Sequence, residues 1–152
     1  MDIIVDLDGT LCDCTWRLPL IQQKPKNWKE FFAGIPRDAC VEPVATLVYH
    51  FAECPANNVV FSTGRPRSTE NDTILWLKRN DMWMKNSRLY MRGTKDFRPD
   101  YVTKRDLLTD IINEGFRPVL AIDDKPEVCD MYEQVGLNVL RVGLGKKVNF
   151  DG

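Results

Sequence analysis

The sequence has little of what zinc-binding and disulfide-rich domains require. It contains one histidine, His50, and five cysteines, an odd number at irregular spacing. Zinc sites usually need four closely spaced cysteine or histidine ligands, and disulfide scaffolds need regularly placed cysteine pairs. We therefore expect neither, and we interpret the cysteines as reduced thiols of a cytoplasmic protein.

Long hydrophobic runs are also missing. No stretch of about 18 apolar residues could form a membrane-spanning helix, so no membrane partner is expected. The first apolar strand begins at residue 3, which leaves no room for a signal peptide. We expect the protein to stay in the cytoplasm where it is made, the host cytoplasm if a phage encodes it.

Neither sign of charge dominates the chain. The sequence has 21 Lys and Arg against 22 Asp and Glu, a formal net charge of -1. Broad nucleic-acid binding depends on many basic contacts to phosphates, so we expect no such grip, although one phosphate or one chain end can still be bound. The sequence contains no G-x-x-x-x-G-K-[ST] motif, which excludes a kinase of the P-loop type, and nothing in it indicates an obligatory protein partner.

Apolar strands alternate with amphipathic helices along the 152 residues. Strands are predicted at 3–5, 58–62, 87–92, 118–124 and 137–142, and helices at 43–53, 63–80, 99–114 and 126–136. This order predicts one α/β domain over residues 1–152, with a parallel sheet and helices on both faces. Residues from about 12 to 42 are predicted to form a small flap. The side chains expected to face the core from the first three helices are Val44, Leu47, Val48, Phe51, Ile74, Leu75, Leu77, Val102, Leu107, Leu108 and Ile111.

Two of the predicted strands end in pairs of carboxylates. Asp6 and Asp8 follow the run "IIV", and Asp123 and Asp124 end the run "VLAIDD". The carboxyl ends of parallel strands meet at one edge of the sheet, where ligands bind in such folds. Four acidic groups there would repel one another unless a cation lay among them. Mg²⁺ is the expected ion, because it takes a few carboxylates together with water and phosphate oxygens.

Three other residues are expected to contribute polar groups at the same edge. Thr63 and Gly64, at the predicted start of a helix, offer a hydroxyl and backbone N–H groups to an anion, and Lys104 can offset negative charge. Lys104 could instead be a solvated helical lysine. Asp124 could be a helix N-cap before Pro126.

The motifs occur in the order Asp-x-Asp-Gly-Thr, then Thr, then Lys, then Asp-Asp. This order resembles that of the haloacid dehalogenase (HAD) superfamily of phosphohydrolases, which implies a Rossmann-like sheet with a minimal cap. The resemblance implies that Asp6 attacks phosphorus to form an aspartyl-phosphate, and that Asp8 protonates the leaving oxygen and later accepts a proton from water. Asp8, turned away from the metal, is then expected to hold its proton.

The resemblance also implies roles for the other site residues. Thr63 and the neighbouring N–H groups would bind the phosphoryl oxygens, with Lys104 neutralising nucleophile and phosphate. Thr10 would assist in substrate binding, or simply close the turn after Gly9. Mg²⁺ would be held by Asp6, the Leu7 carbonyl and Asp123, with Asp124 behind these ligands or bound to the ion through water.

Longer stretches resemble a narrower group. "VVFSTGRP", "LYMRGTKDFRPDYVTK" and "LAIDDKPEVCDMY" are similar to the 3'-phosphatase domain of phage polynucleotide kinase and its free-standing phage and bacterial relatives. The resemblance implies substrate contacts from Gly64 and Arg65 and, less directly, from Arg92 and Arg98, although all three arginines could be surface residues. Trp16 and Trp28 could stack a base or form the core of the flap.

Three functions remain open at this point. The first is an Mg²⁺-dependent phosphatase that removes a 3'-phosphate from a nucleotide or a nucleic-acid end. The second is the same chemistry on 5'-mononucleotides or another small phosphomonoester. The third is a receiver-type phosphoacceptor domain, which is disfavoured because its acidic pair belongs after the first strand, whereas the Asp-Asp pair here follows the fourth.

Overall fold

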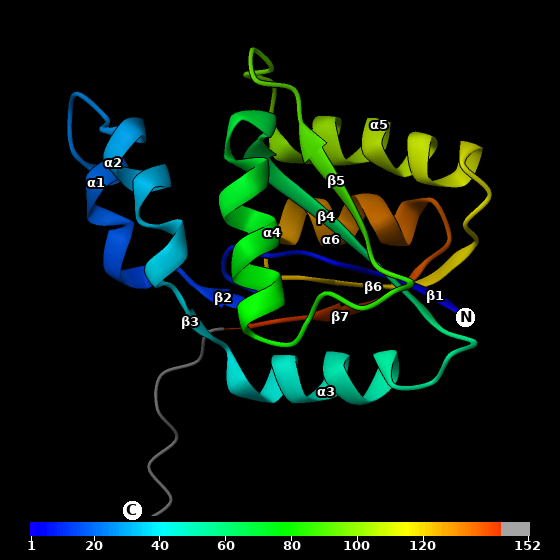
Figure 1. Ribbon diagram of the computed structural model, residues 1–152. Coiled ribbons are helices and arrows are strands. Elements are labelled where there is room, and N and C mark those ends of the chain that lie inside the picture. The colour runs from blue at the N-terminus through cyan, green and yellow to red at the C-terminus, as the bar shows by residue number, and fades with distance from the viewer. Residues whose placement is uncertain (144–152) are drawn as a thin grey trace, which may run out of the picture.

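The computed structural model describes residues 1–143. Its centre is a five-stranded sheet with the strand order β5-β4-β1-β6-β7, and every neighbouring pair of strands is parallel (Figure 1). The strands are β1 (Asp2–Val5), β4 (Asn58–Pro66), β5 (Arg88–Arg92), β6 (Pro118–Asp123) and β7 (Asn138–Arg141). The predicted α/β fold with a parallel sheet is confirmed.

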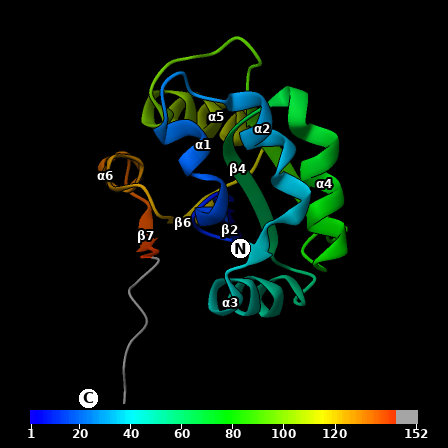
Figure 2. The same cartoon turned by 90° about the vertical axis from the view of Figure 1, so that its left-hand side faces the viewer.

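Helices cover both faces of the sheet, as expected for right-handed crossovers between parallel strands. α3 (Glu42–Ala52) and α4 (Glu70–Arg79) pack on one face, and α5 (Asp100–Asn113) and α6 (Pro126–Gln134) pack on the other (Figure 2). Ile3 and Val5 of β1 join the first core, and Ile4 between them joins the second. A strand buried on both faces explains the continuous apolar run at the start of the chain. Among the described residues, no helix is both long and apolar enough to cross a membrane.

The second strand along the sheet is longer than its sequence suggests. β4 continues through Thr63, Gly64 and Arg65 to Pro66, and a short 3₁₀ turn, η3 (Arg67–Thr69), separates it from α4. The prediction that Thr63–Gly64 opens a helix is therefore wrong. The residue before a proline is disfavoured in the helical region, so Pro66 keeps Arg65 extended and delays the helix.

Two of the predicted core positions are exposed. Leu47 of α3 and Leu75 of α4 face solvent, whereas Ala45, Thr73 and Trp76 are buried. Trp76 defines the inner side of α4, because its indole N–H donates a hydrogen bond of 2.8 Å to the Asp38 carbonyl. Of the remaining predicted core residues, five are buried and four are half-buried; the buried ones are Val48, Leu77, Leu107, Leu108 and Ile111.

A flap interrupts the chain between β1 and α3, where the sequence predicts it. Its neck is an antiparallel pair of two-residue strands, β2 (Cys12–Asp13) and β3 (Ala39–Cys40). Between them lie η1 (Thr15–Arg17), α1 (Pro19–Gln22), α2 (Trp28–Ala33) and η2 (Ile35–Arg37). The flap stands beside the carboxyl ends of the sheet strands, which places it over the edge where the polar motif residues lie (Figure 1).

Candidate active site

A cleft of about 710 Å³ opens at the carboxyl ends of the strands. Buried polar residues form its deep part, among them Asp6, Thr63 and Lys104. The flap and the loop between β5 and α5 supply its outer part, where charged residues such as Asp96 and Arg98 lie among apolar ones; the apolar residues include Leu18, Trp28, Phe32, Phe97 and Pro99. The cleft thus combines a charged floor with several apolar and aromatic side chains nearer its mouth.

Lys104 joins the ends of two neighbouring strands. Its ammonium group donates hydrogen bonds of 2.6 Å to Asp6, which follows β1, and of 2.6 Å to Asp123, which ends β6. Lys104 is almost fully buried, so it is not the solvated helical lysine that its sequence position also allowed. Burial opposes its charge, but the two carboxylates outweigh burial and hold the pKa of Lys104 above its ordinary value.

Three carboxylates lie together around this lysine. Asp6, Asp123 and Asp124 can each place an oxygen within 4.8 Å of the others. Burial, and then the negative charge of Asp6, raises the pKa of Asp123 to about 6 and that of Asp124 to about 7. One lysine does not balance three acids, so the group is short of positive charge. Hard oxygen donors in this arrangement fit Mg²⁺.

The turn after Asp6 fixes how these carboxylates meet. The Thr10 hydroxyl donates to Asp6 at 3.1 Å and to Asp124 at 3.3 Å, while the Thr10 N–H closes the turn onto the Leu7 carbonyl at 3.1 Å. Gly9 has φ +84°, and a Cβ there would lie 2.4 Å from the Asp124 carboxylate. Only glycine therefore allows the turn and the carboxylate to approach so closely.

The Leu7 carbonyl does not fit its predicted role as a metal ligand. It accepts backbone N–H bonds from Thr10, Leu11 and Cys12 at 3.1, 2.9 and 2.8 Å. A carbonyl oxygen has two lone pairs, so the turn itself already uses its capacity.

Asp8 lies in a different environment from Asp6, although only Leu7 separates the two residues. Arg65 and Arg17 contact its carboxylate at 2.6 and 2.7 Å. Burial disfavours the charged form, but the two guanidinium groups outweigh burial and hold the pKa of Asp8 below its ordinary value. The two arginines therefore favour the ionised form of Asp8, against the expectation that it holds its proton. The motif gives no sign that two arginines converge on this residue.

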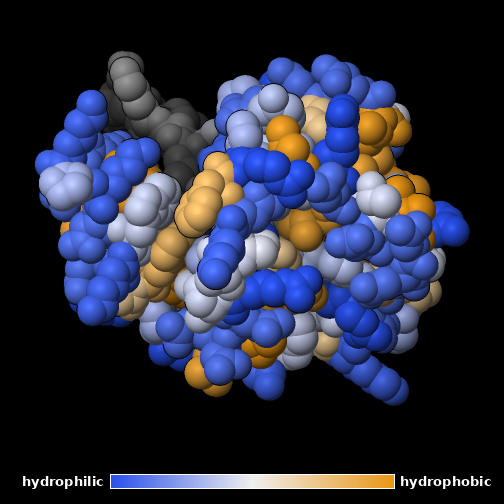
Figure 3. All heavy atoms as spheres, turned by 90° about the horizontal axis from the view of Figure 1, so that it is seen from above, coloured by the Kyte–Doolittle hydropathy of each residue, from blue (hydrophilic) through white to orange (hydrophobic). Residues whose placement is uncertain are grey.

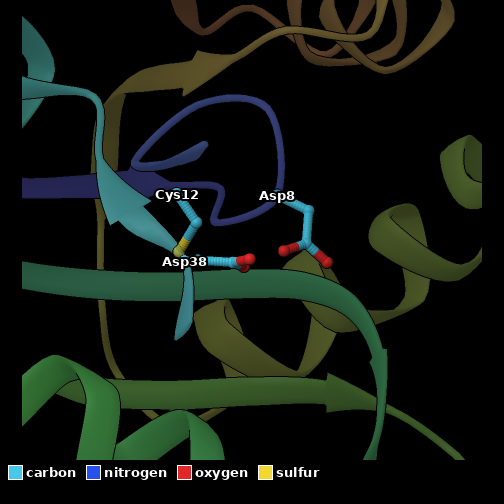
Figure 4. A group of neighbouring side chains, drawn as sticks. All are labelled: Asp8, Cys12 and Asp38. Carbon is cyan, nitrogen blue, oxygen red and sulfur yellow. The ribbon is translucent and has the colours of Figure 1, made fainter. Parts of the chain in front are cut away.

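A second acidic group forms on the flap side of the cleft and contains Asp8, Cys12 and Asp38 (Figure 4). Arg17 binds Asp38 through two nitrogens, at 2.9 and 2.6 Å, and Arg65 lies 3.6 Å from the same carboxylate. Burial also raises the pKa of the Cys12 thiol well above its ordinary value. Two guanidiniums thus balance two carboxylates beside a neutral thiol, which makes this group an ion-pair cluster rather than a metal site.

Arg17 and Asp38 are site residues that sequence reasoning missed. Arg17 is fully buried, donates to the Phe31 carbonyl at 3.1 Å and lies 4.2 Å above the Phe31 ring. Asp38 also accepts a hydrogen bond of 2.9 Å from the Trp16 indole. The available signal was weak, because the flap contains two arginines and two aspartates, and its sequence does not show which of them pair.

The other arginines differ in their placement. Arg92 donates to the carbonyls of Gly64, Asp96 and Arg98 at 2.9, 3.1 and 2.7 Å and pairs with Asp100. Arg92 therefore holds together the segments that border the cleft. Arg98 is half-exposed at the rim, where it pairs with Asp96 and, at 2.8 Å, with Asp106. Arg98 is therefore a surface residue, as the sequence also allowed, whereas Arg65 is buried.

The structure separates the two flap tryptophans. Trp16 packs within the flap, where the Arg37 guanidinium lies 4.7 Å from its ring and a Cβ at Gly34 would lie 2.9 Å from it. Trp28 lines the cleft. Of the two residues suggested for base stacking, only Trp28 is placed for it.

Known proteins resemble this chain in sequence and in structure. A protein of Autographa californica nuclear polyhedrosis virus, provisionally named a bifunctional polynucleotide kinase/RNA ligase, is 27% identical over 133 residues, which are 88% of this chain and 18% of the viral protein. A chain in the structure of the Pnkp1/Rnl/Hen1 RNA repair complex is 25% identical, with a TM-score of 0.74 over 93% of this chain and 42% of that chain. This chain therefore spans less than half the length of these relatives.

A class C acid phosphatase of Bacillus anthracis, solved with tungstate bound, shares the fold, with a TM-score of 0.61, 15% identity and coverage of 84% of this chain and 52% of that chain. The family model described as the polynucleotide kinase PNKP phosphatase domain matches residues 1–146. That span contains the whole described sheet, the flap and every residue of the cleft. The chain is accordingly a phosphatase with the HAD fold, and it belongs to the family of PNKP phosphatase domains.

Proposed function

We propose that the protein removes 3'-phosphate groups from nucleotides or nucleic-acid ends through an aspartyl-phosphate on Asp6. The observation that carries this proposal is the contrast between two neighbouring carboxylates in one cleft. Asp6 lies beside Lys104 and two further acids, and Asp8 lies beside two arginines. Family membership and the names of the relatives support a nucleic-acid end as the substrate.

In the proposed reaction an oxygen of Asp6 bonds to phosphorus while the ester P–O bond breaks, and the leaving oxygen takes the proton of Asp8. Asp8, now ionised, accepts a proton from the water that attacks the phosphoryl group, and phosphate leaves as the Asp6 carboxylate is restored. This divides one difficult displacement into two easier ones. Lys104 stays charged throughout and offsets the negative charge on Asp6.

Asp8 must gain a proton before the first step. A substrate phosphate entering the cleft competes for Arg65, which lines it, and so weakens the pair between Arg65 and Asp8. The pKa of Asp8 then rises toward the range in which a carboxyl group can act as an acid. Thr63 is suited to bind a phosphoryl oxygen, because its hydroxyl oxygen accepts the Arg65 N–H at 3.2 Å and keeps its own hydrogen to donate.

Asp6, Asp123 and Asp124 would hold Mg²⁺ in this proposal. The ion would supply positive charge near the phosphate and so offset the charge that repels an anionic nucleophile. Leu7 is not included, because its carbonyl is occupied by the turn. We further propose that residues 1–152 act as one domain without an obligatory protein partner, which activity of the isolated monomeric chain would test.

The test is phosphate release, with and without Mg²⁺, from a 3'-phosphorylated oligonucleotide, 3'-dTMP, 5'-dTMP and p-nitrophenyl phosphate at matched concentration. We expect Mg²⁺-dependent release with a preference for the 3'-phosphates. Preference for 5'-dTMP or p-nitrophenyl phosphate would overturn the substrate assignment and favour a small-molecule phosphatase. Release from none of the four would overturn the proposed function itself.

A further inference from the structure

Phe97 is an exposed aromatic residue that the reaction at the cleft floor does not use. It is 89% exposed, the highest value among the exposed large hydrophobic residues in the described part of the chain, and it lines the mouth of the cleft. Exposing a large apolar ring to water is unfavourable, so the loop that presents it is a candidate binding surface. That loop, residues 93–99, stands at the top of the molecule between β5 and α5 (Figure 1).

The loop holds Phe97 in place from both sides. One nitrogen of Arg92 donates to the carbonyls of the residues flanking Phe97, those of Asp96 at 3.1 Å and Arg98 at 2.7 Å. The Asp96 carboxylate accepts the backbone N–H of Arg98 at 3.0 Å and the Thr103 hydroxyl at 3.3 Å. These contacts fix the backbone around Phe97, so its exposure is a feature of an ordered loop.

The flap supplies a second aromatic residue to the same cleft. Trp28 is 46% exposed and stacks on Phe32, with ring centroids 5.7 Å apart and an interplanar angle of 20°. The Lys26 ammonium lies over the Trp28 ring, 5.5 Å from its centroid, which places a positive charge at this aromatic surface. Viewed from above, hydrophobic residues border the gap between the flap and the rest of the molecule (Figure 3).

We propose that Phe97 and Trp28 bind the base of the terminal nucleotide whose phosphate lies at Asp6. This inference rests on the proposed function and names the part of the substrate that the mouth of the cleft recognises. The charged floor is sufficient for a phosphate, whereas flat aromatic surfaces at the mouth suit a planar group. Every nucleobase offers such a face, so the contact tolerates any sequence. A sugar phosphate or an aliphatic phosphomonoester offers none.

The test compares two oligonucleotides that differ only at the terminal base. One ends in thymidine 3'-phosphate and the other in an abasic 3'-phosphate, and kcat/KM is measured for both. We expect the wild-type protein to prefer the thymidine end by about 10-fold or more, since stacking of one base on an aromatic side chain is a substantial contribution. Phe97→Ala and Trp28→Ala should each reduce this preference by about 5-fold or more.

Conservative and control variants distinguish a role in base recognition from a role in keeping the protein folded. Phe97→Tyr and Trp28→Phe keep an aromatic face and should retain the preference. Tyr101→Ala removes a half-exposed aromatic residue of α5 that is not among the described residues lining the cleft, and should leave both rates unchanged. Melting temperatures of all variants check that the flap and the loop stay folded.

Two outcomes distinguish the failure of this inference from the failure of the proposed function. Equal rates on the thymidine and abasic ends, or a preference that both alanine variants retain, would overturn the role of Phe97 and Trp28 while leaving 3'-phosphatase activity intact. No phosphate release from either end would overturn the proposed function and this inference with it. Because Phe97 lies outside the flap, its alanine variant stays informative even if Trp28→Ala disturbs the flap.

Discussion

Two charged clusters border one cleft and differ in their balance of charge. The floor cluster, defined as Asp6, Asp123, Asp124 and Lys104, has three acids and one base. The flap cluster, defined as Asp8, Asp38, Arg17 and Arg65, has two acids and two bases. The first lacks positive charge and is suited to take up a cation. The second is balanced and ties the flap to the sheet.

The two clusters show how one short motif can place two aspartates in different chemical environments. Asp6 follows directly on β1 and meets the end of the neighbouring β6 through Lys104. Asp8 lies two positions further along the chain and contacts Arg17 of the flap and Arg65 of β4. The surrounding charges, rather than the residue type, separate the roles of the two aspartates. Variants of either cluster, and its response to pH and Mg²⁺, test this separation of roles.

Asp6→Asn should abolish phosphate release, with a loss of at least about 10⁴-fold in kcat, because an amide cannot form the phosphoryl-enzyme. Steady-state kinetics on a 3'-phosphorylated oligonucleotide measure the effect, and circular dichroism checks the fold. Retained turnover would remove Asp6 from its assigned role.

Asp8→Asn should lower kcat by about 10² to 10⁴-fold, the usual contribution of a general acid–base group. The loss should shrink on p-nitrophenyl phosphate, whose leaving group needs little protonation. A loss of equal size on both substrates would mean that Asp8 acts by holding Arg17 and Arg65 instead.

Asp38→Asn should destabilise the protein by about 3 to 5 kcal/mol, because it removes one of the two carboxylates that balance the buried Arg17 guanidinium. Arg141→Ala is the matched control, since it removes an exposed pair with Asp130 and should change the free energy of unfolding little. Urea unfolding of both variants measures the difference. Similar values for the two would show that the flap cluster does not stabilise the fold.

The floor cluster should make stability depend on pH and on Mg²⁺. The pKa values of Asp123 and Asp124, about 6 and 7, exceed the unfolded value of 3.8, so the folded state binds more protons between these limits. Their contribution to the free energy of unfolding therefore falls as pH rises from about 4 through 7 in the absence of metal. Mg²⁺ should offset this loss and raise the melting temperature more at pH 8 than at pH 5. An equal rise at both pH values would argue against these carboxylates as ligands.

The sequence predicts the sheet and the floor cluster well, for a physical reason. Both depend on local patterns, namely apolar strands followed by acidic residues, and parallel topology brings those strand ends together. The position of Lys104 follows similarly from its helix. The roles assigned to these residues stay predictions until the variants are measured.

The flap cluster could not be predicted in the same way. Arg17 and Asp38 are 21 residues apart and meet only because β2 and β3 pair at the neck of the flap. The exposure of Leu75 has a similar origin, since the bond between Trp76 and the Asp38 carbonyl sets which side of α4 faces inward. Contacts that depend on an irregular segment leave no periodic signal.

Identifying the residue that receives the phosphoryl group tests most directly whether Asp6 is the nucleophile. A 3'-phosphorylated oligonucleotide carrying labelled phosphate is mixed with excess protein, the reaction is stopped with acid within its first turnover, and the labelled peptide is sequenced. We expect label on Asp6 of the wild-type protein and none on Asp6→Asn. Label on another residue, or turnover by Asp6→Asn at the wild-type rate, would contradict this expectation.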